Sequence, residues 1–118
     1  VDRGARIQHG PSFFAKIFDL TAIEFCPDTA HLAAAGGDPA QLIRDHATRI
    51  SYIHLKGLQK DPFAFTPLDQ GDVPTGPILE AMWDVGFEGW VCTELDSWDD
   101  PAEGARVSME YLNRAMAD

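Results

Sequence analysis

Three side chains of types that bind divalent cations stand at or near the ends of apolar runs in this sequence. Asp28 follows the first run, His54 lies in the second and Glu94 lies in the third. Carboxylate oxygens and an imidazole nitrogen suit Mn²⁺, Mg²⁺, Co²⁺ or Zn²⁺ with positions left open for substrate oxygens. No cysteine stands among the three, which argues against a structural zinc site. The residue types therefore predict a divalent metal site.

The elements that must position these side chains alternate between strands and helices. Strands are predicted at the apolar runs 22–26, 51–56 and 88–95. Capping and stop signals predict helices after Ser12, over 31–35, and from Asp38, Pro77 and Pro101. This alternation favours an α/β fold of parallel strands covered by helices, in which sites form where the carboxyl ends of strands meet the loops. Residues 57–76 show little periodicity and predict a long loop, a feature that is often functional.

The alternation of side chains along a strand favours convergence of the three residues. Because successive side chains point to opposite faces, His54 shares a face with Lys56, and Glu94 shares a face with Cys92. Ile53 lies on the opposite, aliphatic face, which suits packing against helices. The mixed face suits the interior of a barrel with a site at its top.

Each of these residues also has a structural alternative. Asp28 can cap a short helix, His31 alone is more often a surface residue, and His54 can be a hydrogen-bonded core histidine. Glu94 is the most informative, because a carboxylate in an apolar strand is costly unless it is paired or bound to a cation. Glu24 would share a face with Asp28, so we expect it to line the lower barrel and to need a partner.

The composition limits the class of protein. A chain of 118 residues with 45% hydrophobic and 24% charged residues predicts one globular domain. The net charge of −10 argues against a nucleic-acid binder, and no apolar run approaches the roughly 20 residues of a membrane span. Cys26 and Cys92 lie far apart in apolar runs and predict two reduced core thiols. We therefore expect a cytoplasmic protein without nucleic-acid or membrane partners.

Five stretches resemble, in the same order, the sugar phosphate isomerase/epimerase family with a xylose-isomerase-like barrel, which includes inosose dehydratases. They are FCPDTAHL at 25–32, AGGDP at 35–39, RISYIHLK at 49–56, PL at 67–68 with Gly71, and GWVCTELD at 89–96. The resemblance implies the C-terminal portion of a (β/α)8 TIM barrel. Residues 1–118 would then form a single partial barrel domain with the last three strands and their flanking helices, after a loose lead-in over 1–11.

The same resemblance implies roles for individual residues. Asp28, His54 and Glu94 would be three of four metal ligands, and the fourth, a glutamate, would come from strands that precede this chain. The cofactor expected is a divalent metal, with Mn²⁺ preferred to Mg²⁺, Co²⁺ or Zn²⁺. Glu94 would also be catalytic, and His31 and Lys56 would bind the substrate.

The activity implied is that of a sugar isomerase or epimerase, which moves a proton beside a carbonyl through an enediolate. In dehydratase members, similar groups expel water from a keto-cyclitol. We expect as partners a small sugar, ketose or keto-cyclitol, and either further copies of the chain or the N-terminal half of the barrel. Two alternatives stay open: a non-catalytic barrel fragment that acts as an assembly module, and an abasic-site endonuclease-like phosphodiesterase, which the negative charge disfavours.

Overall fold

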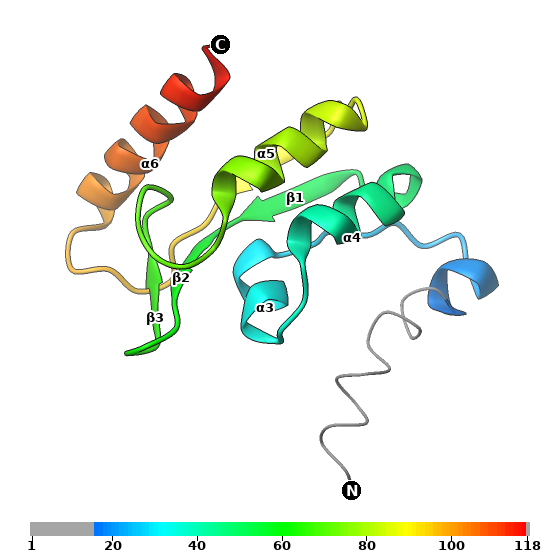
Figure 1. Ribbon diagram of the computed structural model, residues 1–118, viewed down its shortest axis with the longest axis horizontal. Coiled ribbons are helices and arrows are strands. Elements are labelled where there is room, and N and C mark those ends of the chain that lie inside the picture. Colours follow the sequence, from blue (N-terminus) through cyan, green and yellow to red (C-terminus); the bar gives the residue numbers. More distant parts are fainter. Residues whose placement is uncertain (1–15, 118) are drawn as a thin grey trace, which may run out of the picture.

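The computed structural model describes residues 16–117 and has the alternation of helices and strands that the sequence predicts (Figure 1). In chain order the elements are α3 (Thr29–Ala34), α4 (Pro39–Asp45), the 3₁₀ helix η1 (Ala47–Arg49), β1 (Tyr52–Leu55), β2 (Gly57–Gln59), β3 (Ala64–Thr66), α5 (Thr75–Asp84), β4 (Trp90–Thr93) and α6 (Pro101–Met116). Residues 16–20 are also helical, whereas the start of the helix predicted after Ser12 lies outside the described residues.

β1 is the centre of a parallel arrangement. It pairs in parallel with β4, in a register that places His54 opposite Cys92. On its other edge β1 meets the segment 25–28 through an isolated parallel bridge between Asp28 and His54, and a second such bridge joins Phe25 to Ile50, just before β1. The continuous strand predicted at 22–26 is therefore wrong. The segment runs parallel to β1, but Pro27 has no N–H to donate, and its carbonyl accepts from the His54 N–H instead (2.9 Å).

The region 57–76 differs from the long loop that the sequence predicts. β2 and β3 form an antiparallel hairpin there, with Gly57 opposite Thr66. Leu58 and Leu68 are buried beside the hairpin, and the Leu68 N–H donates to the Ser108 hydroxyl of α6 (3.1 Å). α6 accordingly lies on the hairpin side of the molecule (Figure 1). Strands of three residues are too short to show the alternation from which a strand is predicted.

α4 and α6 begin where the sequence predicts, because side-chain caps satisfy their first N–H groups, whereas α3 begins at Thr29, two residues before the helix predicted over 31–35. Asp38 accepts from the Gln41 N–H at the start of α4, and Asp100 accepts from the Glu103 N–H at the start of α6. Both helices have a proline in their first turn, where its missing N–H removes no hydrogen bond. The start of α5 lies two residues before the predicted Pro77.

The core lies on the aliphatic face of β1. Ile53 and Leu55 are fully buried in one cluster with Ile43 of α4 and Ile78 of α5, and these two helices lie side by side (Figure 1). The opposite face is more open among the described residues, where His54 is half-buried.

The two cysteines are free, as predicted, but only one is even half-buried. Cys26 is exposed, so the prediction of two core thiols is wrong. It belongs to the segment 25–28, which pairs with the chain around β1 at only two isolated bridges, and the described residues do not cover its side chain. Cys92 in β4 is half-buried.

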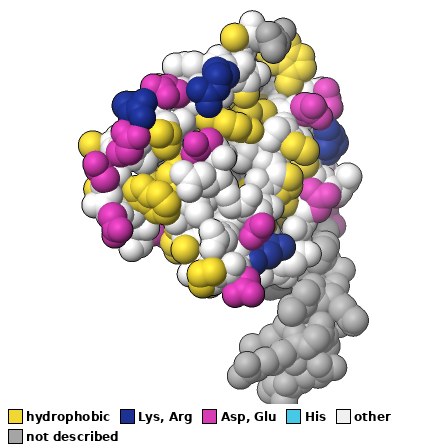
Figure 2. All heavy atoms as spheres, turned by 60° about the vertical axis from the view of Figure 1, so that its left-hand side comes forward, with side chains coloured by type: hydrophobic (Ala, Val, Ile, Leu, Met, Phe, Trp, Pro, Cys, Tyr) yellow, Lys and Arg dark blue, Asp and Glu magenta, His cyan; other side chains and the backbone are white. Residues whose placement is uncertain are grey.

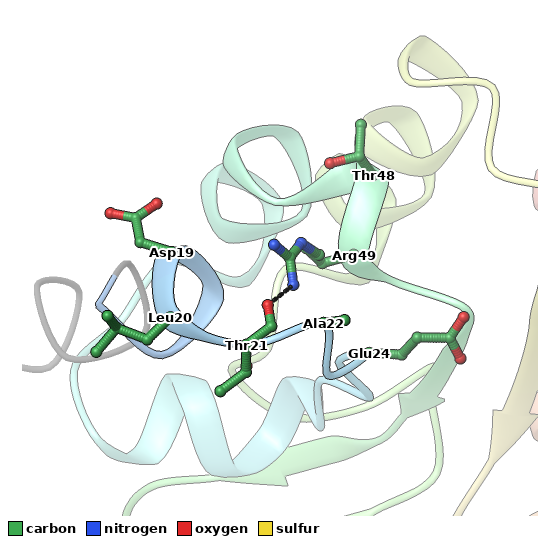
Figure 3. A pocket seen from close by; sticks show the side chains of 7 residues that line it. All are labelled: Asp19, Leu20, Thr21, Ala22, Glu24, Thr48 and Arg49. Atoms are coloured by element: carbon green, nitrogen blue, oxygen red, sulfur yellow. Dashed lines mark hydrogen bonds between the residues drawn. The ribbon is translucent and has the colours of Figure 1, made fainter.

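Arg49 anchors the segment that leads into the sheet (Figure 3). Its guanidinium donates to the carbonyls of Thr21 (2.7 Å) and Phe18, and it lies over the Phe18 ring at 5.6 Å from the centroid. An open hollow of about 500 Å³ lies beside this anchor. Glu24 points away from the arginine and accepts from the Ser51 hydroxyl (2.9 Å), which supplies the partner that we expected.

Two glycines with opposite surroundings test the packing of the hairpin. A Cβ at Gly57 would lie 2.6 Å from the Thr66 carbonyl oxygen and 2.8 Å from that of Pro67, whereas a Cβ at Gly76 in α5 would meet no atom within 4 Å. We expect Gly57→Ala to lower the free energy of unfolding by about 1–3 kcal/mol. Gly76→Ala should change it by less, because an added Cβ there meets only the restriction that the following Pro77 places on a helical residue. Urea unfolding followed by circular dichroism measures both, and equal effects would contradict the described hairpin.

Candidate metal centre

The structure brings Asp28, His54 and Glu94 together at one end of the parallel arrangement. Asp28 closes the segment 25–28, His54 lies in β1, and Glu94 follows the last residue of β4. Each offers one ligand atom, and these three atoms all lie within 4.8 Å of one another. The hollow beside Arg49 lies elsewhere, next to the bridge between Phe25 and Ile50 at the amino end of β1.

Each ligand side chain is held by a second contact. The His54 ring has its Nδ1 2.8 Å from Glu94 Oε2, and the side chains of these two residues are about one third exposed. Asp28 caps α3 with one oxygen, which accepts from the His31 N–H (2.9 Å), while its other oxygen takes part in the cluster. The capping alternative for Asp28 is therefore correct and leaves a carboxylate oxygen available.

A buried cation lies behind these carboxylates. The Lys56 side chain is 1% exposed, and its ammonium forms a direct ion pair with Asp96. The Nζ atom also lies 3.7 Å from Asp28 Oδ2 and 3.7 Å from Glu94 Oε2, and 4.2 Å from the centroid of the Phe65 ring. Sequence reasoning had placed Lys56 at the site but had missed that Asp96 is its partner, although Asp96 stands two residues after Glu94 and so shares its face.

The charges of Lys56 and Asp96 stabilise each other. Burial is the largest influence on Lys56 and acts to lower its pKa. The hydrogen bond to Asp96, together with the charges of Asp28, Glu94 and Asp96, outweighs burial and raises the pKa of Lys56 above 10.5. The hydrogen bond from Lys56 in turn lowers the pKa of Asp96 below 3.8. Both groups are therefore charged at neutral pH.

Thr29 joins the start of α3 to the end of β1. Its hydroxyl is fully buried, donates to the Lys56 carbonyl (2.9 Å) and accepts from the Lys56 N–H (2.9 Å). These two bonds fix the backbone of Lys56 next to Asp28. Sequence reasoning missed Thr29 as well, because a threonine in a first helical turn carries no signal of a long-range contact.

His31 lies at the exposed rim of the site. Its side chain is 61% exposed, and its Nε2 lies 3.8 Å from Asp28 Oδ2. The His31 ring packs edge-on against Phe65, with centroids 5.5 Å apart. The roles predicted for His31 and Lys56 in binding substrate stay predictions, and the two side chains differ in that only His31 is open to solvent.

The donor set fits a divalent cation. Two carboxylates and one imidazole nitrogen converge, and the Lys56 ammonium stands beyond hydrogen-bond distance of the nearest oxygens of Asp28 and Glu94. Hard oxygen ligands with one imidazole are typical of Mn²⁺, Mg²⁺, Co²⁺ and Zn²⁺ sites. No helix within residues 16–117 has the length and apolar character needed to cross a membrane.

One protein-family model matches nearly the whole chain. The family model described as xylose isomerase-like TIM barrel matches residues 7–115. The inosose dehydratase of Clostridium tetani is 29% identical over an alignment of 117 positions, gaps included, that covers 85% of this chain and 38% of that protein. The inosose dehydratase of Lacticaseibacillus casei is 30% identical over an alignment of 111 positions, gaps included, that covers 75% of this chain and 37% of that protein. The chain thus spans less than two fifths of the length of these relatives.

Solved structures show the same fold. An L-ribulose 3-epimerase superposes with a TM-score of 0.68 at 19% identity, over 80% of this chain and 36% of that one. A xylose isomerase domain protein from Planctomyces limnophilus superposes with a TM-score of 0.67 at 22% identity, over 78% of this chain and 37% of that one. The chain therefore folds as about a third of such a barrel.

The link between α3 and β1 is tested by Thr29→Val, which keeps the shape of the side chain and removes its hydroxyl. Two backbone groups of Lys56 would then be buried without a partner. We expect the free energy of unfolding to fall by about 1–3 kcal/mol. The exposed Thr48→Val is the matched control and should change it by less than about 0.5 kcal/mol. Similar values for the two variants in urea unfolding would show that the Thr29 hydroxyl carries no such link.

Proposed function

Because the chain belongs to the xylose isomerase-like TIM barrel family, we propose that Asp28, His54 and Glu94 contribute three ligands to the divalent metal centre of a sugar isomerase, epimerase or keto-cyclitol dehydratase. The observation that carries this proposal is the convergence of their ligand atoms within 4.8 Å. Parallel strands of such barrels place catalytic residues at their carboxyl ends, which is where these three stand.

A divalent cation held there supplies electrostatic stabilisation to a carbonyl oxygen of the substrate. Asp28 and Glu94 contribute negative charge, and His54 contributes an imidazole nitrogen on a ring that is in contact with Glu94. We expect a fourth ligand from a part of the barrel that the described residues do not include. Mn²⁺ is the preferred cation, and Mg²⁺, Co²⁺ and Zn²⁺ suit the same donors.

Glu94 is the residue proposed to move the proton. It is a carboxylate about one third exposed, so a substrate that enters from the open side can reach it. In isomerase and epimerase chemistry it takes a proton from the carbon beside the carbonyl and returns it. In dehydratase chemistry a group in the same place assists loss of a hydroxyl. His31 at the rim is placed to donate a hydrogen bond to a substrate hydroxyl.

The substrate class proposed is a small sugar, ketose or keto-cyclitol. The relatives carry the names inosose dehydratase and L-ribulose 3-epimerase, which are activities on molecules of this kind. On the face shown in Figure 2, acidic side chains are scattered among the described residues. The few basic side chains there form no continuous basic surface. That face lends no support to an abasic-site endonuclease-like activity, since binding of nucleic acid needs basic side chains that neutralise phosphates.

An assembly role is the second candidate, and exposed aromatic residues favour it. Trp90 in β4 is 77% exposed and Trp83 in α5 is 86% exposed. Large exposed apolar side chains of this kind often mark contact surfaces. Further copies of the chain or other parts of a barrel are the proposed partners for such a surface.

Titration of the chain with Mn²⁺ in a calorimeter tests the metal centre. We expect Glu94→Gln and His54→Ala each to weaken Mn²⁺ binding by about 10-fold or more, because each removes one ligand. Glu80→Gln, which removes the same charge from an exposed position of α5, is the control and should leave the affinity within about twofold. Equal affinity in all four proteins would contradict the metal centre.

Incubation of the chain with Mn²⁺ and a ketose in D₂O separates the two candidate functions. Proton transfer is measured by NMR as incorporation of deuterium at the carbon beside the carbonyl. If the chain is catalytic as it assembles in solution, Glu94→Gln should slow incorporation by about 100-fold or more, whereas Glu80→Gln should not. Mn²⁺ binding without any incorporation would favour the assembly role.

A further inference from the structure

The cluster of carboxylates contains its own cation. Lys56 is among the most buried side chains described, although it carries a charge, and its ammonium faces three carboxylates at once. Asp96 is in direct contact with it, whereas Asp28 and Glu94, the two anionic ligands proposed for the metal, each lie 3.7 Å away. One buried charge is thus shared between the ligands and a residue that is not a ligand.

The contacts with the two ligands are electrostatic. A separation of 3.7 Å exceeds the length of an N–H···O hydrogen bond, so the ammonium leaves the lone pairs of these oxygens free for another partner. Its charge still acts on them strongly, because the Lys56 side chain is buried and charges interact more strongly away from bulk water. A positive charge at this distance weakens the attraction of Asp28 and Glu94 for a second cation.

The ammonium is held in this place from several sides. The Lys56 backbone is fixed by two hydrogen bonds to Thr29, and the Phe65 ring lies under Nζ at 4.2 Å. Asp96 draws the ammonium toward itself through their ion pair and cancels its charge. Without Asp96, the charge of Lys56 would be shared by Asp28 and Glu94 alone.

We propose that the Lys56–Asp96 pair is a positioning element that sets how strongly Asp28 and Glu94 attract a divalent cation. Asp96 strengthens the attraction because it neutralises the Lys56 ammonium. Lys56 weakens the attraction because its positive charge offsets the negative charge of Asp28 and Glu94. The inference rests on the proposed metal centre and deepens it. Within this group, three carboxylates and one ammonium give −3 + 1 = −2 with His54 neutral. Loss of the Asp96 charge leaves −1, and loss of the Lys56 charge leaves −3.

The two changes should therefore act in opposite directions. In calorimetric titration with Mn²⁺, Asp96→Asn should weaken binding by about 10-fold, and Lys56→Met should tighten it by about 10-fold. If the pair only maintained the shape of the site, both variants would bind Mn²⁺ more weakly. Asp99→Asn, in the same loop as Asp96, and Lys60→Met, at an exposed lysine, are the matched controls and should stay within about twofold of the wild type.

Because the Lys56 side chain is buried, the folding of Lys56→Met is checked separately and its Mn²⁺ binding is measured in a second way. Circular dichroism checks each variant, and the rise in melting temperature on addition of Mn²⁺ should be larger in Lys56→Met and smaller in Asp96→Asn than in the wild type. Asp96 is 41% exposed, so Asp96→Asn is expected to fold. Lys56→Gln, which removes the charge but keeps a polar side chain, takes the place of Lys56→Met if that variant does not fold, and it should also bind Mn²⁺ more tightly.

The outcomes separate this inference from the proposed function. A wild-type chain that binds Mn²⁺, with Asp96→Asn binding equally well, would overturn the inference and leave the metal centre standing. A wild-type chain that binds no Mn²⁺ would overturn the metal centre and the inference together. Weaker binding in Asp96→Asn, together with tighter binding when the Lys56 charge is removed and with unchanged controls, supports the inference, whereas weaker binding in both variants would overturn it.

Discussion

β1 pairs on both of its edges, and this arrangement decides where the candidate ligands lie. The segment 25–28 meets one edge and β4 meets the other, both in parallel. Parallel pairing brings the carboxyl ends of all three to the same side of the fold. Asp28, His54 and Glu94 meet there because each stands near such an end, not because any two of them are close in sequence.

The positions of the candidate ligands could be predicted from the sequence because they depend on short-range rules. Strand alternation placed His54 on the face opposite Ile53, and the structure buries Ile53 fully while leaving His54 half-open. Asp38 and Pro101 signalled the starts of α4 and α6 because such signals depend only on residues next to the start of a helix. The order of elements then followed from the alternation.

The remaining features depend on contacts that local patterns do not encode. The β2–β3 hairpin has three residues in each strand, too few for periodicity, and the segment 25–28 pairs only at isolated points. The pairing of Lys56 with Asp96 joins residues 40 positions apart. It became visible only when β1 and β4 were placed side by side, and the burial of a lysine gives no signal in sequence.

The most direct test of the account is the position of Mn²⁺ in a crystal of this chain grown with the ion, located by anomalous diffraction at the manganese absorption edge. The account predicts one strong peak within coordination distance of Asp28, His54 and Glu94, with Lys56 still paired to Asp96. A peak only at other surface carboxylates, or none near His54 at saturating Mn²⁺, would contradict it.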